Sequence, residues 1–428
     1  MKSHFPTRSL LGATALVGLG FAFCGAPAQA QQTELDTLRE QIAALQNRLN
    51  TLEDAQKKTA DTAKAAPASV NAGKFPLVVS GLIQVHSLNY LNENVKTGGA
   101  GSNDTFRLRR SEIRITAPSI TNRLSGTINI DVARAASTTT PGTFQGGANN
   151  ILQDLQVTYK ASPVTNTTSQ LFFDAGQFKV PIGYEAALVP TSQVPLLERS
   201  LIFTGRDPFG TTYGDQRDVG VQARAVTKQF EARAGIFNGF GDRQNALAAT
   251  DEKALIALLA YKPTFVNGLT VGASGGAGNT GVSFTPTGGT ATNLKASRNI
   301  FNAFAVYKKN KITLQGEYLR GHSAPFTVAT VTNGSRNLQG FYAGGSYLFN
   351  PRFETLLRYD TLNFNTAQTG NIVRDYILGF NYYIKGQNKL QLNIVRRVGG
   401  LNAPTSTNPA ANYRNNRFEL RTGVQLAF

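Results

Sequence analysis

The sequence predicts an all-β fold: a sixteen-stranded antiparallel transmembrane β-barrel with an inward-folded third loop, preceded by a short N-terminal coiled coil. Two observations predict the barrel. Apolar and polar residues alternate along many segments from residue 75 to the C-terminus, which is the period of a strand whose two faces meet different surroundings. Short connections also alternate with long connections rich in Gly, Asn and Thr, as in barrels of bacterial outer membranes.

Residues 1–30 predict a signal peptide. Basic residues precede an apolar run over residues 10–23, and Ala28-Gln29-Ala30 gives a small-residue cleavage pattern. The apolar run is too short for a retained membrane helix, and the bulky Phe23 before Cys24 disfavours a lipoprotein. Cleavage after residue 30 removes the only cysteine, and the formal charge of +17 falls by two, to +15.

The composition of the exported chain limits its partners. The chain has no later run of about 20 apolar residues, so the sequence predicts no membrane-spanning helix after residue 30. A strongly basic protein outside the cytoplasm is not expected to bind nucleic acid. Small anionic solutes such as phosphate, outer-membrane lipid and lipopolysaccharide are the expected partners.

Residues 31–58 predict a coiled coil in the periplasm. Apolar residues recur at alternating spacings of three and four at Leu35, Leu38, Ile42, Leu45, Leu49 and Leu52, which is a heptad pattern. A single amphipathic helix is the alternative, and mixed Leu and Ile do not fix the number of helices. Residues 59–74, rich in Ala, Ser and Pro, predict a flexible linker.

Residues 75–428 predict the barrel, with strands that begin near residues 77, 105, 123, 150, 169, 217, 230, 253, 269, 299, 311, 338, 352, 375, 389 and 416. The last strand alternates most clearly. One face carries Phe418, Leu420, Thr422, Val424, Leu426 and Phe428, and the residues between them, such as Glu419, Arg421 and Gln425, form the other face. A soluble β-sandwich can show the same alternation. The alternating connection lengths favour the arrangement in which the apolar face meets lipid.

The segment from residue 171 to residue 216 organises the predicted barrel. An apolar strand breaks at Pro181 and Gly183, because proline cannot donate to a sheet ladder. Residues 184–216 then form the longest connection in the chain. A long ordered connection of this kind is usually functional, and we expect it to fold into the barrel and narrow the bore.

The chain resembles the phosphate-selective porin O/P family of Gram-negative outer membranes. The motifs that carry the resemblance are Gly176-Gln177-Phe178-Lys179-Val180-Pro181-Ile182-Gly183, Glu198-Arg199-Ser200 and Arg217-Asp218-Val219-Gly220-Val221, with weaker matches at Gly235-Ile236-Phe237-Asn238-Gly239 and Arg358-Tyr359-Asp360. The resemblance implies a trimeric barrel whose third loop folds inward and whose basic residues draw anions through. It does not fix phosphate as the solute.

The candidate residues of the solute path come from three groups. The first is a cluster on the predicted second strand, Arg107, Arg109, Arg110 and Arg114. The second is the loop with its flanks, where Glu185 and Glu198 are expected opposite that cluster, with Lys179, Arg199, Arg206 and Arg217 nearby. The third comprises inward basic positions of other strands, Lys160 and Arg224. Some of these arginines have an alternative role in salt bridges within the wall.

The alternation gives a nearly balanced interior, with nine basic and eight acidic inward positions. A strictly phosphate-selective pore should instead carry a dense ladder of Arg and Lys. We therefore predict passive diffusion of small hydrophilic solutes with a preference for anions, phosphate or polyphosphate being the leading candidates. The alternatives are a weakly selective general porin, and a non-conducting barrel that anchors a coiled-coil tether.

Other signals do not predict chemistry. The segment over residues 276–281 matches GxGxxG, but no helix is predicted after it, and an external loop is the expected structure. His86 and His322 are the only histidines after residue 30, too few for a His-based metal site. No cofactor is expected, and an enzyme is not predicted.

Overall fold

The computed structural model describes residues 69–72, 75–91, 104–135, 151–163, 168–204, 217–240, 253–284, 292–328, 331–333, 335–367, 371–399 and 417–428, with helical positions 41, 44 and 46. The predicted signal peptide lies outside the described residues. So do the predicted coiled coil, apart from those three positions, and most of the predicted linker. The chain divides into two units, Met1–Ala66 and Pro67–Phe428, and the second contains the barrel.

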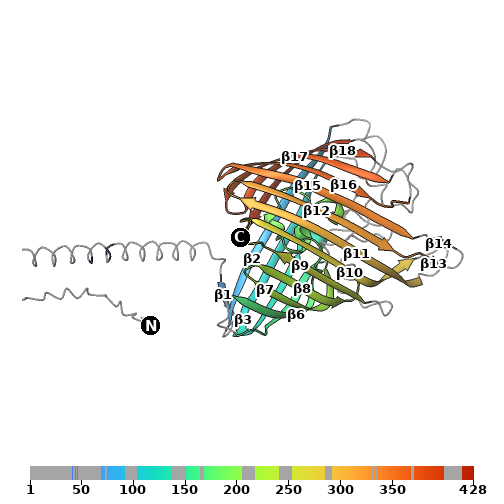
Figure 1. Cartoon of the computed structure of the whole chain (residues 1–428). Coiled ribbons are helices and arrows are strands. Elements are labelled where there is room, and N and C mark those ends of the chain that lie inside the picture. Colours follow the sequence, from blue (N-terminus) through green and yellow to red (C-terminus); the bar gives the residue numbers. More distant parts are fainter. Residues whose placement is uncertain are drawn as a thin grey trace, which may run out of the picture. The chain divides into compact units, whose positions relative to one another are not determined.

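Sixteen antiparallel strands close into the barrel, as the sequence predicts (Figure 1). The strands are β2 (Phe75–Tyr90), β3 (Thr105–Thr121), β4 (Leu124–Asp131), β5 (Leu152–Lys160), β6 (Ser169–Lys179), β7 (Arg217–Thr227), β8 (Phe230–Phe237), β9 (Ala254–Tyr261), β10 (Leu269–Phe284), β11 (Thr292–Lys309), β12 (Ile312–Ser323), β15 (Arg336–Asn350), β16 (Phe353–Asn363), β17 (Ile372–Lys385), β18 (Asn388–Gly399) and β19 (Arg417–Ala427). The last strand pairs with the first of them, from Glu419 opposite Tyr90 to Ala427 opposite Leu82. The backbone amide of Gly81 also donates to the carbonyl of Phe428 at 2.8 Å.

The structure differs from the predicted boundaries in three regions. The strand β1 (Ser69–Ala72) pairs with β2, so the sheet begins within the predicted linker. The strands β10 and β11 extend beyond prediction, and the GxGxxG segment lies in β10 rather than in a loop. The hairpin of β13 (Phe326–Val328) and β14 (Val331–Asn333) lies in the connection predicted over residues 321–337. A strand segment that extends past the lipid bilayer does not face lipid and therefore needs no apolar side. Hydrophobic alternation consequently does not reveal these extensions.

The outward face of the barrel is apolar and the inward face is largely polar. In β19, Val424 and Leu426 are 53% and 47% exposed, whereas Glu419 and Gln425 are 0% and 2% exposed. Outward side chains of a barrel meet lipid and inward ones meet the lumen. The apolar-outward arrangement is thus confirmed for this strand.

The third loop folds into the barrel. After β6 it contains α3 (Tyr184–Ala187), η3 (Thr191–Gln193) and α4 (Leu201–Thr204). Gly183 has a φ of 75°, and a Cβ there would lie 2.4 Å from the ring of Phe203, so only glycine suits this turn. No helix among the described residues is long and apolar enough to cross a membrane.

Side chains of the opposite wall bind the backbone of this loop. Lys389 donates to the carbonyl of Val194 at 2.7 Å and Asn381 donates to that of Pro195 at 2.8 Å. Gln425 donates to the carbonyl of Ser192 at 2.8 Å. These bonds come from β17, β18 and β19, so the loop reaches across the barrel and its carbonyls remain satisfied.

Part of the interior is apolar, which the sequence did not predict. Strands β9, β11, β12, β15, β16 and β17 bury Ile256, Ile300, Leu319, Leu338, Leu362 and Val373 in one cluster with loop residues Ile182, Ile202 and Phe203. A Cβ at Gly340 would lie 2.7 Å from Ile202, so this glycine lets the loop approach the wall closely. The loop therefore packs on one part of the wall through apolar contact.

Candidate functional site: the basic wall and the third loop

Two arginines of β3 contact one carboxylate of the third loop. Arg109 donates from Nε and Nη2 to the carboxylate oxygens of Glu198 at 2.9 and 2.8 Å, and Arg107 donates to Oε1 of the same group. Fork-like pairing of this kind is the stronger form of the arginine–carboxylate interaction. The loop is thereby joined to β3.

A β-bulge brings the whole β3 cluster to the interior. Gln84 pairs with Arg110 and Val85 pairs with Leu108, so Arg109 is the extra residue. In a regular strand Arg107 and Arg110 would point to opposite faces. The extra residue of the bulge lets Arg107 and Arg110 point to the same face. Strict alternation, which takes no account of a bulge, places only part of the cluster inside.

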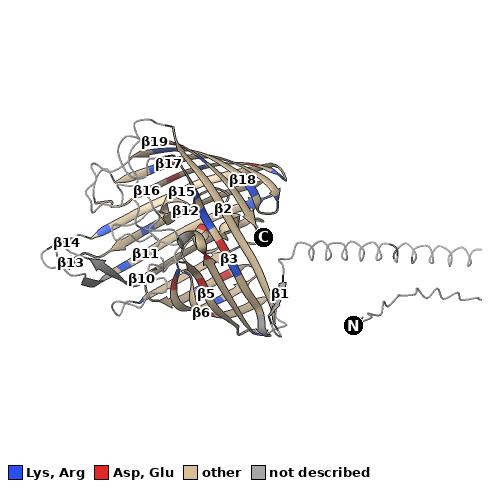
Figure 2. Cartoon of the chain, turned by 180° about the vertical axis from the view of Figure 1, so that it is seen from behind, with Lys and Arg blue, Asp and Glu red and all other residues tan. Residues whose placement is uncertain are grey.

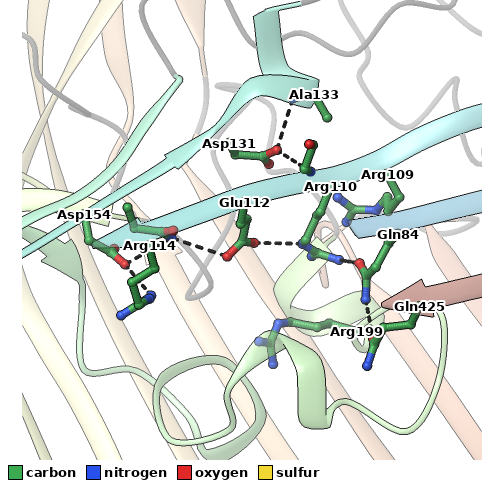
Figure 3. A network of polar contacts seen from close by, with 12 residues as sticks. Gln84, Arg109, Arg110, Glu112, Arg114, Asp131, Ala133, Asp154, Arg199 and Gln425 are labelled. Atoms are coloured by element: carbon green, nitrogen blue, oxygen red, sulfur yellow. Dashed lines mark hydrogen bonds and ion pairs between the residues drawn. The ribbon is translucent and has the colours of Figure 1, made fainter. Parts of the chain in front are cut away.

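Arg110 and Arg114 are bound by neighbours in the wall (Figure 3). Arg110 donates to Oε1 of Gln84 at 2.8 Å, and its Nε lies 3.7 Å from Glu112. Arg114 donates to Oδ2 of Asp154 at 2.8 Å. The side chain of Arg114 remains 43% exposed, so its guanidinium can meet a solute.

Asp154 of β5 is shared between two strands. Besides Arg114 of β3, Arg217 of β7 donates to its Oδ1 at 2.7 Å. The same pattern holds at Glu198, which also binds two arginines. One negative charge facing two positive charges leaves the wall locally positive.

Glu185 was expected opposite the arginines of β3, but its side chain contacts β16 instead. Its carboxylate accepts from Arg358 of β16 at 3.1 Å and from the backbone amide of Ser200 at 2.8 Å. Arg199 is 3% exposed and donates to the carbonyls of Glu185 and Val189 within the loop. These two residues therefore hold the shape of the loop, rather than facing the β3 cluster.

The remaining candidates lie apart from this centre. Lys179 donates to the carbonyl of Ala186 at 3.0 Å. Arg224 donates to Asp174 at 3.1 Å and lies 4.3 Å from the ring centroid of Phe172. Lys160 ends β5 on its inward parity. Arg206 lies outside the described residues.

A third shared carboxylate is missing from the sequence candidates. Glu419 of β19 binds both Arg417 and Arg421, and Arg397 of β18 binds Asp375 through two hydrogen bonds of 2.6 and 2.5 Å. The alternation of the last strand already placed Glu419 inward, so this signal was present in the sequence. Figure 2 shows Lys and Arg interspersed with Asp and Glu on the barrel strands.

The charge state of Glu198 follows from its neighbours. Burial alone would raise the pKa of its carboxyl group, but the charges of Arg109 and Arg107 outweigh burial and hold the pKa well below its ordinary value. The group is therefore ionised at neutral pH, and the contact is an ion pair rather than a neutral hydrogen bond.

A closed barrel with an inward third loop and a charged lumen is an outer-membrane porin of the Gram-negative type. The sequence model of the family "Phosphate-selective porin O and P" matches residues 87–428. The chain belongs to this family. Barrels of this family are typical of non-enzymatic channels.

Solved outer-membrane proteins share the fold at low sequence identity. The anion-selective porin of Comamonas acidovorans aligns with a TM-score of 0.55 and 13% identity, over 82% of this chain and 99% of that chain. OmpT of Vibrio cholerae aligns with a TM-score of 0.53 and 10% identity, over 84% and 100%. The channel DcaP of Acinetobacter baumannii gives 0.51 and 13%, over 84% and 100%. No curated protein matches the sequence.

Proposed function

We propose that this porin allows passive diffusion of small hydrophilic solutes with a preference for anions, phosphate and polyphosphate being the leading candidates. The observation that carries this proposal is the sharing of carboxylates, because Glu198, Asp154 and Glu419 each bind two arginines. A positive interior with low-dielectric walls raises the local concentration of anions, by about 10-fold or more. No step of diffusion requires a cofactor.

Phosphate is the favoured anion on chemical grounds. A guanidinium pairs with two phosphate oxygens at once and replaces part of the hydration that the ion loses. Arg114 suits this role best among the β3 arginines, because its side chain is 43% exposed while Arg107, Arg109 and Arg110 are 26%, 14% and 9% exposed.

The experiment is a reversal potential across a salt gradient in a planar bilayer, followed by block of the chloride current by phosphate. The wild-type protein should prefer chloride over potassium. The variant R114Q should show lower anion preference and require more phosphate for block, while Asp154 retains Arg217 as a partner. The variant R320Q is the matched control, because Arg320 is exposed and lies on an outward position of β12. Unchanged selectivity in R114Q would count against this proposal.

Two other functions predict different currents. A weakly selective general porin is favoured by the direct pairing of the basic residues with carboxylates, which occupies their donors, and it predicts permeability ratios near one. A non-conducting barrel that anchors a coiled-coil tether predicts no current. The reversal-potential experiment separates all three.

The assembly is also a proposal. We propose a homotrimer in the outer membrane, surrounded by lipid and lipopolysaccharide, with residues 31–58 as a periplasmic coiled coil, residues 59–74 as the connecting segment and residues 1–30 as the cleaved signal peptide. A trimer form is described for OmpT of Vibrio cholerae. The family resemblance supports the same assembly for this chain.

A further inference from the structure

Two arginines on neighbouring strands face outward from the barrel wall close to each other. Arg374 of β17 and Arg396 of β18 lie on the outward parity of their strands, whereas Asp375 and Arg397 beside them are 2% and 5% exposed in the interior. Each arginine lies near the strand end that adjoins a long connection, away from the tight turn at Gly386. In a porin the long connections face outside, so these guanidiniums lie toward the outer leaflet.

Neither guanidinium has a polar partner within the described part of the barrel. Among the residues that the structure describes, no hydrogen bond or ion pair involves the side chain of Arg374 or Arg396. An arginine on the lipid face is unfavourable unless it reaches the headgroup level or meets an anion. The two arginines are diagonal neighbours, since Arg374 pairs with Val398 and Arg396 with Tyr376. Diagonal neighbours of this kind are about 7–8 Å apart, and their Cβ atoms are somewhat closer.

A groove opens beside Arg396 on the same outer face. Ala343, Tyr359, Tyr376, Arg396 and Phe418 are successive register partners across β15 to β19. They line a hollow of about 430 Å³. The rings of Tyr359 and Tyr376 lie 5.1 Å apart, and aromatic residues of this kind mark the membrane interface.

The next row extends the groove along the lipid face. Gly345, Leu357, Leu378 and Ile394 are successive partners in that row and also line the hollow. Leu357 is 64% exposed, and Gly345 and Ala343 have little side chain to fill the space. The hollow thus has an apolar floor that begins directly below a cationic rim.

We infer that this groove binds a phosphorylated glycolipid of the outer leaflet, namely lipopolysaccharide, through its lipid A phosphates. Arg374 and Arg396 would pair with the phosphates, and an acyl chain would lie along the row from Gly345 to Ile394. Two adjacent guanidiniums suit a lipid with two phosphates better than a phospholipid with one. The inference rests on the outer-membrane location of the porin and not on its selectivity.

A second copy of the chain is a poorer occupant. Every Asp and Glu on a described barrel strand lies on an inward row. The outer wall formed by those strands therefore offers no carboxylate that could neutralise Arg374 and Arg396 across a subunit interface. Charge complementarity thus favours the anionic lipid over the neighbouring subunit.

The test uses the detergent-solubilised mature protein and purified diphosphoryl lipid A, with bound copies counted by native mass spectrometry. The double variant R374Q/R396Q should bind at least 10-fold more weakly than the wild type. R320Q, which removes an outward arginine from β12 outside this groove, should bind normally. Reversal potentials should be the same in all three proteins, so a failure of this inference is distinct from a failure of the proposed selectivity.

A second variant tests the groove without changing charge. A343W should fill the hollow and weaken lipid A binding by several-fold while both arginines remain. Equal binding by the double variant and the wild type would overturn the inference, as would equal binding of phosphatidylglycerol and diphosphoryl lipid A. Conversion of the double variant from trimer to monomer with normal lipid A binding would also overturn it, and would assign the face to subunit contact.

Discussion

At the scale of single residues, one extra residue in β3 decides which charges reach the lumen. Sequence alternation alone places Arg110 and Arg114 inside and leaves Arg107 and Arg109 on the other parity. The bulge at Arg109 brings Arg107 and Arg109 inward as well, and Glu198 neutralises part of the charge of these two residues. Four cations on one strand repel each other unless they are paired or solvated, and the pairing partners come from three different elements.

The lowered pKa of Glu198 predicts a lack of pH dependence. A carboxyl group whose pKa is lower in the folded state adds stability above its unfolded pKa of about 4.3, and this stability is lost as pH falls through the folded pKa. Its charge should therefore be constant between pH 7 and pH 5. His86 lies 3.9 Å from this carboxylate, so the measurement is made in the variant H86Q to remove any effect of the histidine. In that variant, protonation of Glu198 should not change the reversal potential between pH 7 and pH 5.

The double variant H86Q/E198Q is the control for that measurement. It should show greater anion preference already at pH 7, because Arg107 and Arg109 lose their shared negative partner. A change in selectivity centred above pH 5 in H86Q, absent from H86Q/E198Q, would contradict the prediction.

At the scale of elements, two wall carboxylates position the third loop. Glu317 of β12 accepts from the backbone amides of Tyr184 and Glu185, both at 2.7 Å. Asp360 of β16 accepts from the hydroxyl of Ser200 at 2.8 Å and the amide of Leu201 at 2.9 Å. Each carboxylate thus meets the start of a short loop helix, where backbone amides lack helical partners.

Replacing one anchor should loosen the loop without opening the barrel. D360N places an amide donor where two loop donors now converge, and the lost interactions should destabilise the seated loop by about 1–3 kcal/mol. We expect larger fluctuations of the single-channel current and faster proteolysis within residues 184–216. E231Q is the matched control, since Glu231 binds Arg233 at 2.5 Å. Equal current noise in both variants would mean that Asp360 does not hold the loop.

The sequence predicts the barrel better than it predicts the loop contacts. Strand number and order follow from hydrophobic period and connection length, since both are local properties. The contact between Ile202 and the wall near Gly340 is different, because it joins segments far apart in the sequence. An inward wall residue such as Leu319, 0% exposed beneath the loop, breaks the polar-inward rule for a reason that no local pattern contains.

At the scale of the whole molecule, arginine pairs that share one acid recur at Glu198, Asp154 and Glu419. Arg358 shows the reverse arrangement, because it contacts two acids, Glu185 and Asp360. The alternation predicts nearly equal counts of both signs along the strand wall, which argues against strict phosphate selectivity but not against a preference for anions. Arg217 and Arg417 add positive charge beside Asp154 and Glu419, and each lies at the first residue of its strand. Arg217 was predicted beside the third loop, whereas Arg417 was not among the predicted residues of the solute path, because strand ends are the least predictable positions in a sequence.

Removing residues 31–66 should separate conduction from assembly. The hydrogen bonds and ion pairs described for the lumen all lie between residues of the second unit, Pro67–Phe428. A protein in which the signal peptide is joined directly to Pro67 should therefore show the wild-type single-channel conductance and reversal potential. Its trimers should dissociate at a lower temperature in gel electrophoresis of unheated and heated samples, because the coil that would help to hold them together is missing. The decrease should be small, since a coil of about three heptads adds only modest stability on its own. A changed conductance would instead indicate that the N-terminal segment reaches the bore, and unchanged dissociation would remove its proposed role in holding the trimer together.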